Sequence, residues 1–378
     1  MPNNIEEYEF TARYPSTDSI KYVKGRNYIT PPNPEKGFFF GYALFIPEGC
    51  ELDTTLLVHC INTGGSGVTD GKLDRTKPAV TLKEGEEAAK LESFKGNEAV
   101  FCSSDLKMPL LTPLFPRIRG FYTHSLGNKV YNNDTSYLEE LNSIPSQYEK
   151  LSEEEIALIK EKCRDLPGQL VSMIEDSKEV LQNLGITVDN KVIIEGYSAG
   201  SKFANLFTAL HPEIVKACIG GGIGGLGILP VSELKGQELK FPLGVADVPD
   251  FDLEAFKEIP QYYYIGEQDT NDPAQVKSVE ANGEMLPYYP ECYTAHEITQ
   301  IHTLLGKNVQ ERFDNNKRIY EQFGINAIFQ KIYGNHRTIA LLQDVKTGKY
   351  IVHENIVKFI KNVIEKEKEL TDSSSKAM

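Results

Sequence analysis

A short apolar run at 191–196, KVIIEG, passes within a few residues into an amphipathic helical pattern, and this junction constrains the fold more than any other part of the chain. The run has the length and the unbroken apolar character of a strand buried on both faces. After a turn at 196–200, four apolar residues recur at the i, i+3, i+4 and i+7 spacing of one helix face: Phe203, Leu206, Phe207 and Leu210. Pro212 ends that helix. The pattern predicts a buried strand, a sharp turn and a helix.

The same alternation of strands and helices extends along most of the chain. Further strands are predicted at 38–47, 56–61, 99–104, 214–220, 261–266 and 326–334. Helices are predicted at 166–184, with Gly185 at its end, and at 353–368. Strands that alternate with helices favour an α/β fold with a mainly parallel sheet.

No repeat and no linker divides the 378 residues, so one domain is expected at 38–370, preceded by an extension at 1–37 and followed by a polar tail at 371–378. The alternation lapses in three stretches, which are interpreted as insertions in the domain: 105–165, 227–258 and 271–298.

The composition excludes several classes of protein. Its 40% hydrophobic and 25% charged residues are ordinary for a globular protein, and the net charge is −14. An acidic chain is repelled by nucleic-acid phosphates and by anionic lipid surfaces, so neither is an expected partner.

The six cysteines show no paired spacing that would indicate a zinc site, and the apolar runs are too short to span a membrane. The N-terminal MPNNIEEYEF lacks the basic and apolar regions of a secretory signal. A cytoplasmic location is therefore expected, with no metal and no organic cofactor.

The turn itself carries the motif G-x-S-x-G as Gly196-Tyr197-Ser198-Ala199-Gly200. A strand, a sharp turn and a helix are the context in which this motif places a reactive serine. The helix N-terminus directs backbone N–H groups toward the place where negative charge would develop on an attacked carbonyl. Ser198 is therefore predicted to be a nucleophile, the alternative being a structural serine in a strand-to-helix turn.

A serine hydroxyl needs a base, and the base needs a group that orients it. Among the seven histidines, only His336 directly follows a predicted strand, which makes it the expected base. Asp269 lies just past the strand at 261–266 and is the expected orienting acid, with Asp272 as its competitor and Glu267 as a weaker candidate.

An oxyanion hole requires two backbone donors. One is expected to be the N–H of Ala199, the residue after the serine. The other is expected from the glycine-rich loop after the strand at 56–61, where Thr63 is preferred and Asn62 and Gly64 remain alternatives.

The ordered set GYSAG, GEQD and GNH, with a strand and a TGG loop upstream, resembles the α/β-hydrolase superfamily over about residues 38–366. In outline the pattern is similar to bacterial esterases and to the polyhydroxyalkanoate-depolymerase-like branch. The resemblance implies a mostly parallel sheet of about eight strands and an insertion acting as a lid. It also implies Ser198 as nucleophile, His336 as general base and acid, and Asp269 as the orienting acid. Where many members have His-Gly after the third strand, this chain has Ile61-Asn62.

Three other motifs fail on inspection. The segment NTGGSGVTDGK has Ser66 where a phosphate-binding loop needs its first glycine, and Leu73 where that loop needs a serine or threonine. The motif GGGIGG at 220–225 is followed by Pro230 where a dinucleotide-binding fold needs a helix. In HEITQIH, Gln300 stands where a zinc-binding H-E-x-x-H motif has its second histidine.

The sequence thus predicts a serine hydrolase that cleaves a small-molecule acyl substrate, most simply a carboxylic ester. A peptidase, thioesterase, lactonase or acyl transferase would use the same residues. A catalytically silent binding protein with the same fold is the alternative from another class.

Overall fold

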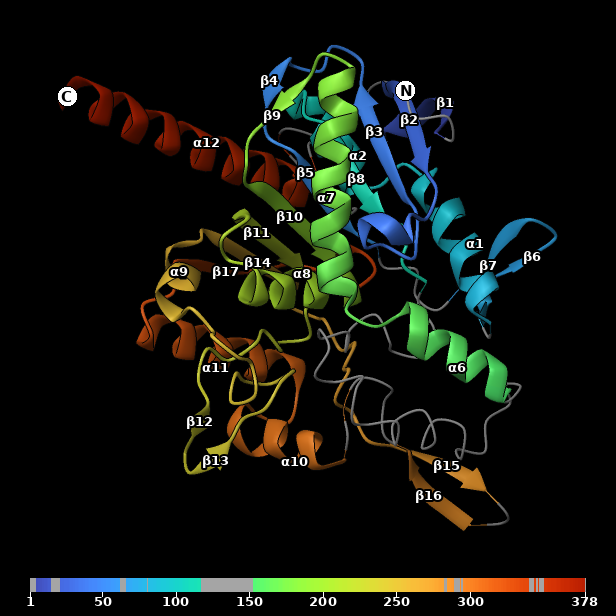
Figure 1. Cartoon of the computed structure of the whole chain (residues 1–378). Helices are drawn as coiled ribbons and strands as arrows, with labels where there is room; N and C mark the ends of the chain where they lie inside the picture. Colours follow the sequence, from blue (N-terminus) through green and yellow to red (C-terminus); the bar gives the residue numbers. More distant parts are fainter. Residues whose placement is uncertain are drawn as a thin grey trace.

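Nine strands form one sheet in the computed structural model of this chain, in the order β1-β2-β3-β8-β5-β10-β11-β14-β17 (Figure 1). Their bounds are β1 Glu6–Tyr14, β2 Lys21–Thr30, β3 Tyr42–Pro47, β5 Leu57–Cys60, β8 Leu110–Pro113, β10 Val192–Tyr197, β11 Val215–Gly221, β14 Gln261–Gly266 and β17 Ala327–Ile332. The structure describes residues 5–14, 21–61, 66–79, 81–116, 152–281, 284–288, 293, 295–339, 343–344, 346 and 350–377.

The strands from β8 to β17 all run parallel, whereas β1, β2 and β3 join the sheet through antiparallel pairings. The expected α/β fold with a mainly parallel sheet is confirmed. Parallel strands end at the same sheet edge, so the segments that follow β5, β10, β11, β14 and β17 meet there.

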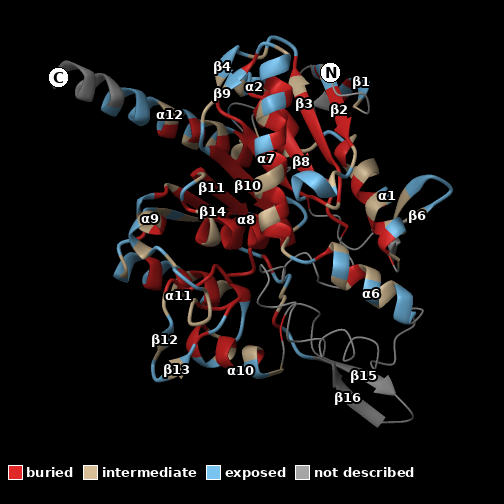
Figure 2. Cartoon of the chain, in the orientation of Figure 1, coloured by how far each residue is buried: buried red, intermediate tan, exposed pale blue. Residues whose placement is uncertain are grey.

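Helices cover both faces of the sheet. On one face lie α7 (Leu166–Asn183), α8 (Ala199–Leu210) and α11 (Val309–Gln322), and on the other lie α2 (Glu98–Leu106) and α12 (Ile351–Ala377). Strand β14 shows the consequence: Tyr263 packs with the first group, while Tyr262 and Tyr264 pack with the second. Buried residues accordingly concentrate along the central strands and on the helix surfaces that face them (Figure 2).

Smaller elements surround this core. Short two-stranded pairs are formed by β4 (Asp53–Thr54) with β9 (Thr187–Val188), β6 (Ser66–Thr69) with β7 (Lys72–Pro78), β12 (Glu233–Leu234) with β13 (Gln237–Glu238), and β15 (Lys277–Ala281) with β16 (Glu284–Tyr288). Within the described residues, the other helices are η1 (Pro34–Lys36), α1 (Leu82–Ser93), α6 (Glu153–Lys162), α9 (Leu253–Glu258) and α10 (Ala295–Leu304).

One predicted strand is wrong. Residues 99–104 lie in helix α2, where the side chain of Asn97 caps the helix by accepting a hydrogen bond from the N–H of Val100 at 3.0 Å. A short apolar run buried on most sides has the same appearance in a helix and in a strand, so periodicity alone does not separate them. The strand predicted at 38–47 begins only at Tyr42.

The structure also bears on the predicted boundaries. Residues 1–37, interpreted as an extension, include β1 and β2, which share the main sheet with the rest of the domain. The stretch at 105–165, interpreted as an insertion, begins instead with β8, a strand inside the main sheet, and ends with α6, while much of the rest lies outside the described residues. The other two stretches contain β12, β13 and α9, and β15, β16 and the start of α10. Within the described part of the chain, no helix has the length and apolar character needed to cross a bilayer.

Candidate active site

Ser198 occupies the sharp turn between β10 and α8 with φ +55° and ψ −118°. This backbone region is unfavourable for a residue with a side chain and costs on the order of 1–3 kcal/mol. Hydrogen bonds hold it there, because the Ser198 N–H donates to Gly221 O at 2.7 Å and its carbonyl accepts from Lys202 N at 3.1 Å. The hydroxyl does not cap the helix that it precedes. The turn therefore presents a hydroxyl that local structure does not use.

Glycines on either side of Ser198 allow the backbones to approach closely. A Cβ atom on Gly200 would lie 2.0 Å from the carbonyl oxygen of Cys60, at the end of β5. A Cβ on Gly196 would lie 2.3 Å from the carbonyl carbon of Gly200. Only glycine fits at these two positions, and the fit sets the first turn of α8 directly against the chain that leaves β5.

Of the predicted oxyanion-hole donors, only Ala199 lies among the described residues. Ala199 is the first residue of α8, so its N–H belongs to the unpaired donors of a helix N-terminus. Thr63 and its alternatives Asn62 and Gly64 lie outside the described residues. The chain enters that segment from Ile61, whose carbonyl carbon lies 3.4 Å from the Cβ position of Gly200.

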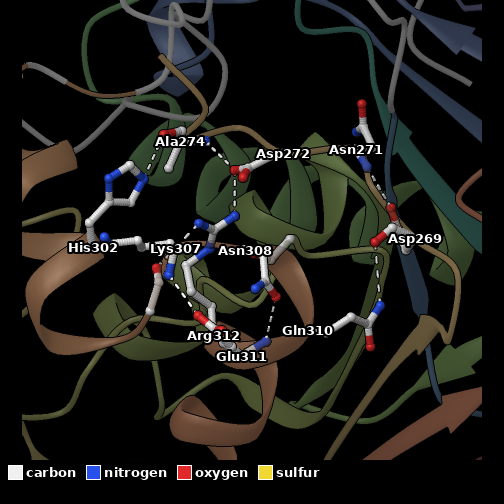
Figure 3. Close-up of polar contacts among 12 residues, drawn as sticks. Asp269, Asn271, Asp272, Ala274, His302, Lys307, Asn308, Gln310, Glu311 and Arg312 are labelled. Carbon is white, nitrogen blue, oxygen red and sulfur yellow. Dashed lines mark hydrogen bonds and ion pairs between the residues drawn. The ribbon is translucent and has the colours of Figure 1, made fainter.

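Asp269 and His336 meet at the ends of the neighbouring strands β14 and β17. The imidazole Nδ1 of His336 lies 2.8 Å from Oδ2 of Asp269, which is 2% exposed. The other oxygen of Asp269, Oδ1, accepts the backbone N–H of Asn271 at 2.9 Å (Figure 3). Gln310 on α11 fastens the turn by donating to Gly266 O at 2.8 Å and to Asp269 O at 3.3 Å.

The competing acids are engaged or point elsewhere. Asp272 forms an ion pair with Arg312, whose side chain is fully buried on α11 (Figure 3). Glu267 is exposed to solvent. Of the three carboxylates considered from sequence, only Asp269 contacts His336.

The turn at Ser198 and the imidazole of His336 border the same pair of glycines. Gly221 accepts the Ser198 N–H, and a Cβ on Gly222 would lie 2.8 Å from Cε1 of His336. Tyr197 links the two segments, since its ring lies 5.1 Å from the imidazole and its hydroxyl donates to His336 O at 2.5 Å.

The second nitrogen of His336, Nε2, lies 3.2 Å from Nδ2 of Asn271. Among the described residues no hydrogen bond joins it to Ser198. Because Asn271 can only donate through Nδ2, a neutral imidazole with its proton on Nδ1 satisfies both neighbours. That tautomer leaves a lone pair on Nε2, the atom that a general base would use.

Burial raises the pKa of Tyr197, and the nearby charge of Asp269 raises it further. The phenol therefore stays protonated and acts only as the donor to the His336 carbonyl. Tyr197, Asn271 and Gln310 were not singled out from the sequence. The sequence offered one indication of a role for Tyr197, because this residue immediately precedes the serine in the motif. The contacts of Asn271 and Gln310 could not be predicted, because they depend on how α11 and the turn after β14 pack.

The glycine-rich motif at 220–225 serves packing around this site. Gly222 packs against His336, and a Cβ on Gly225 would lie 2.5 Å from Phe313 N on α11.

The histidine at the end of the HEITQIH segment contacts a backbone carbonyl. On α10, Nε2 of His302 lies 3.1 Å from the carbonyl oxygen of Ala274 (Figure 3).

A cavity of about 380 Å³ lies at the opposite end of α8 from Ser198, lined partly by Leu210, His211, Phe241 and Phe251. None of Ser198, Asp269 or His336 lines this cavity.

Three features identify the architecture. Antiparallel strands form one edge of the sheet, one crossover places β8 between β3 and β5, and the serine turn follows β10. The chain has the α/β-hydrolase fold. This confirms the fold expected from the sequence, with nine strands where about eight were expected.

Comparisons with solved structures return proteins described as hydrolases, depolymerases and esterases, all at low similarity. Poly(aspartic acid) hydrolase-1 from Sphingomonas sp. KT-1 is 12% identical, with a TM-score of 0.42 over 87% of this chain and 92% of its own. LpqC, a poly(3-hydroxybutyrate) depolymerase from Bordetella parapertussis, is 13% identical, with a TM-score of 0.40 over 82% and 83%. Brefeldin A esterase is 10% identical, with a TM-score of 0.40 over 96% and 79%. No family model and no curated protein sequence matches the chain.

Proposed function

We propose that this protein is a serine-dependent hydrolase of carboxylic esters. The observation that supports it most is the pairing at one sheet edge of a strained serine turn with an imidazole held by a buried carboxylate. Strain in a backbone is maintained only when the surrounding structure enforces it, and here it falls on a serine whose hydroxyl does not cap the helix that follows.

In the proposed reaction, His336 Nε2 takes the proton of Ser198 as the hydroxyl oxygen attacks the acyl carbonyl. The C–O bond to the alcohol then breaks, and the imidazolium returns its proton to the departing alkoxide. Water, activated by the same nitrogen, next attacks the acyl-serine and releases the acid. Asp269 keeps the Nδ1 proton in place and stabilises the charged ring during both steps.

For this sequence of events, the Ser198 hydroxyl must replace Asn271 at Nε2 of His336. The Asn271 amide occupies that lone pair at 3.2 Å and is exposed, so its displacement needs only a side-chain rotation. Catalytic hydrogen bonds are often long or misaligned until substrate is bound.

The oxyanion of the tetrahedral intermediate would be held by the N–H of Ala199, with Thr63 as the proposed second donor. Ala199 begins a helix of 12 residues, so the macrodipole adds to its hydrogen bond. Loss of one such donor typically lowers kcat by about 10²–10³-fold.

A fluorophosphonate probe tests this proposal directly, because it reacts only with an activated serine. We expect labelling of the wild type and loss of labelling in Ser198→Ala and His336→Ala. Ser201→Ala is the matched control, because Ser201 lies three residues further along in α8, is buried, and its hydroxyl has no hydrogen-bond partner among the described residues. Labelling that survives in Ser198→Ala would refute the assignment of the nucleophile. No labelling of the wild type across several pH values would favour a silent binding protein.

A panel of p-nitrophenyl esters of increasing chain length, run beside thioester and aminoacyl-amide substrates, then separates the reaction classes that share these residues. We expect turnover of esters above that of amides, and a loss of about 10³–10⁶-fold in kcat in Ser198→Ala. Preferred turnover of thioesters or amides would replace the ester assignment with a thioesterase or peptidase.

A further inference from the structure

A cluster of nitrogen, sulfur and oxygen donors lies on the face of the sheet opposite α8, where α12 packs against α2. Glu98 and Cys102 are four residues apart on α2 and share one helix face. His353, in the first turn of α12, inserts between them with its side chain 2% exposed. The three side chains belong to no part of the candidate active site.

Two of the three donor–donor distances within the cluster match those required for tetrahedral zinc. Cys102 Sγ lies 3.6 Å from His353 Nδ1 and 3.5 Å from Glu98 Oε1. With Zn–S near 2.3 Å and Zn–N and Zn–O near 2.0–2.1 Å, tetrahedral angles place sulfur about 3.5–3.6 Å from each of the other two ligands. The third separation, His353 Nδ1 to Glu98 Oε1, is 2.6 Å and would have to open to about 3.3 Å.

The far side of the imidazole has the partner that a zinc-bound histidine usually has. His353 Nε2 lies 2.9 Å from Oδ2 of Asp105, one turn further along α2. A carboxylate that accepts the other ring N–H fixes the tautomer and orients the ligating nitrogen. The side chain of Glu98 is 23% exposed, which gives an ion a route from solvent.

Negative charge surrounds the cluster. The carboxylates of Glu98 and Asp105 contact the two ring nitrogens of His353, and Glu98 also contacts the thiol of Cys102. This charge favours a dication, which must displace the protons of the thiol and of the imidazole when it binds.

We propose that Glu98, Cys102 and His353 form a zinc site, with Asp105 orienting the histidine. The set of one thiolate, one imidazole and one carboxylate suits Zn²⁺, and a water molecule completes the tetrahedron. Zn²⁺ displaces the thiol proton of Cys102 and the Nδ1 proton of His353, and both protons pass to solvent. No electron transfer is involved.

The site would fasten the start of α12 to α2. Helix α12 follows the segment that begins with Gly334, Asn335 and His336 after β17. A metal at this point would therefore anchor the far end of the chain segment that carries His336 while contacting no group of the active site.

The test uses the untagged full chain, stripped with a chelator and titrated with Zn²⁺ against a chromophoric chelator. Zinc per chain is measured by elemental analysis and the unfolding temperature is measured with and without metal. Cys102→Ala removes the sulfur ligand, and Asp105→Asn removes only the charge behind the histidine. Cys163→Ala is the matched control, because Cys163 is an equally buried cysteine at the end of α6.

We expect one zinc per chain and a raised unfolding temperature in the wild type and in Cys163→Ala. Affinity should fall by more than about 100-fold in Cys102→Ala and by about 10- to 100-fold in Asp105→Asn. With Co²⁺ in place of zinc, a thiolate-to-cobalt absorption band should appear in the wild type and vanish in Cys102→Ala. A wild type that takes up no zinc, or a folded Cys102→Ala that binds zinc or shows the cobalt band like the wild type, would overturn the proposal.

Discussion

His336 Nδ1 lies 2.8 Å from Oδ2 of Asp269, a residue 67 positions earlier in the chain. The two residues follow β17 and β14, which are neighbours in the sheet and run parallel. The contact is thus a product of strand order: each side chain follows the carboxyl end of its strand, and both ends lie at one edge. Buried Asp269 has its charge satisfied by this imidazole and by a backbone N–H.

Replacing Asp269 with asparagine should lower kcat by about 10³–10⁴-fold while leaving KM within a few-fold. The amide removes the charge that stabilises the imidazolium and the acceptor that holds the Nδ1 proton. Steady-state hydrolysis of a p-nitrophenyl ester measures the effect. A loss of less than tenfold would mean that another carboxylate performs this task.

In contrast to Asp269→Asn, Asp272→Asn should lower the stability of the protein and leave its activity largely intact. It leaves the guanidinium of Arg312 buried without its ionic partner, which is expected to cost about 3–5 kcal/mol of unfolding free energy in chemical denaturation. At temperatures where the variant is folded, kcat should stay within about tenfold of the wild type.

Glu321→Gln is the control for this prediction, because it removes an exposed ion pair with Lys317 on the same helix. It should cost no more than about 0.5 kcal/mol. A collapse of activity in folded Asp272→Asn would return this residue to consideration as the orienting acid.

Gly200→Ala should destabilise the protein by at least about 3 kcal/mol, although alanine is favoured over glycine in a helix by about 1 kcal/mol. The added Cβ would meet the Cys60 carbonyl oxygen at 2.0 Å, so α8 must move away from β5. Thermal unfolding measures the loss.

Gly185→Ala is the comparison variant, with φ +80° and open space around the new Cβ. Its cost should be only the roughly 1–2 kcal/mol of a left-handed backbone. Equal stability losses in the two variants would contradict the tight contact at the serine turn.

Tyr197→Phe should lower kcat by about 2- to 13-fold with little change in KM. It removes one buried hydrogen bond to the His336 carbonyl, worth about 0.5–1.5 kcal/mol, and so loosens the segment that positions the imidazole. Kinetics on a single ester substrate are sufficient. A loss as large as that of His336→Ala would instead place the phenol in direct contact with the reacting groups.

Sequence reasoning succeeded where local pattern and local structure coincide. The run at 191–196 forms β10, the helix after Ser198 follows the predicted periodicity, and β14 spans Gln261–Gly266 as predicted. It failed at α2, because the sheet and α12 bury five consecutive residues of this helix, Ala99 to Ser103, and such a run shows no helical periodicity. That error also concealed the cluster of Glu98, Cys102 and His353, since i and i+4 share a face only in a helix.

By itself, the sequence determined the strand, turn and helix around Ser198 and the polar residues placed after each later strand, because these depend on side-chain periodicity and on glycine's small size. The tertiary structure alone decided which carboxylate meets His336, since Asp269 and Asp272 are three residues apart and the choice depends on Arg312 arriving from α11. It likewise decided that β1 and β2 extend the sheet and that α12 brings His353 to α2. Contacts between distant segments depend on how the helices and strands pack, and packing is determined by residues throughout the chain rather than by any single motif.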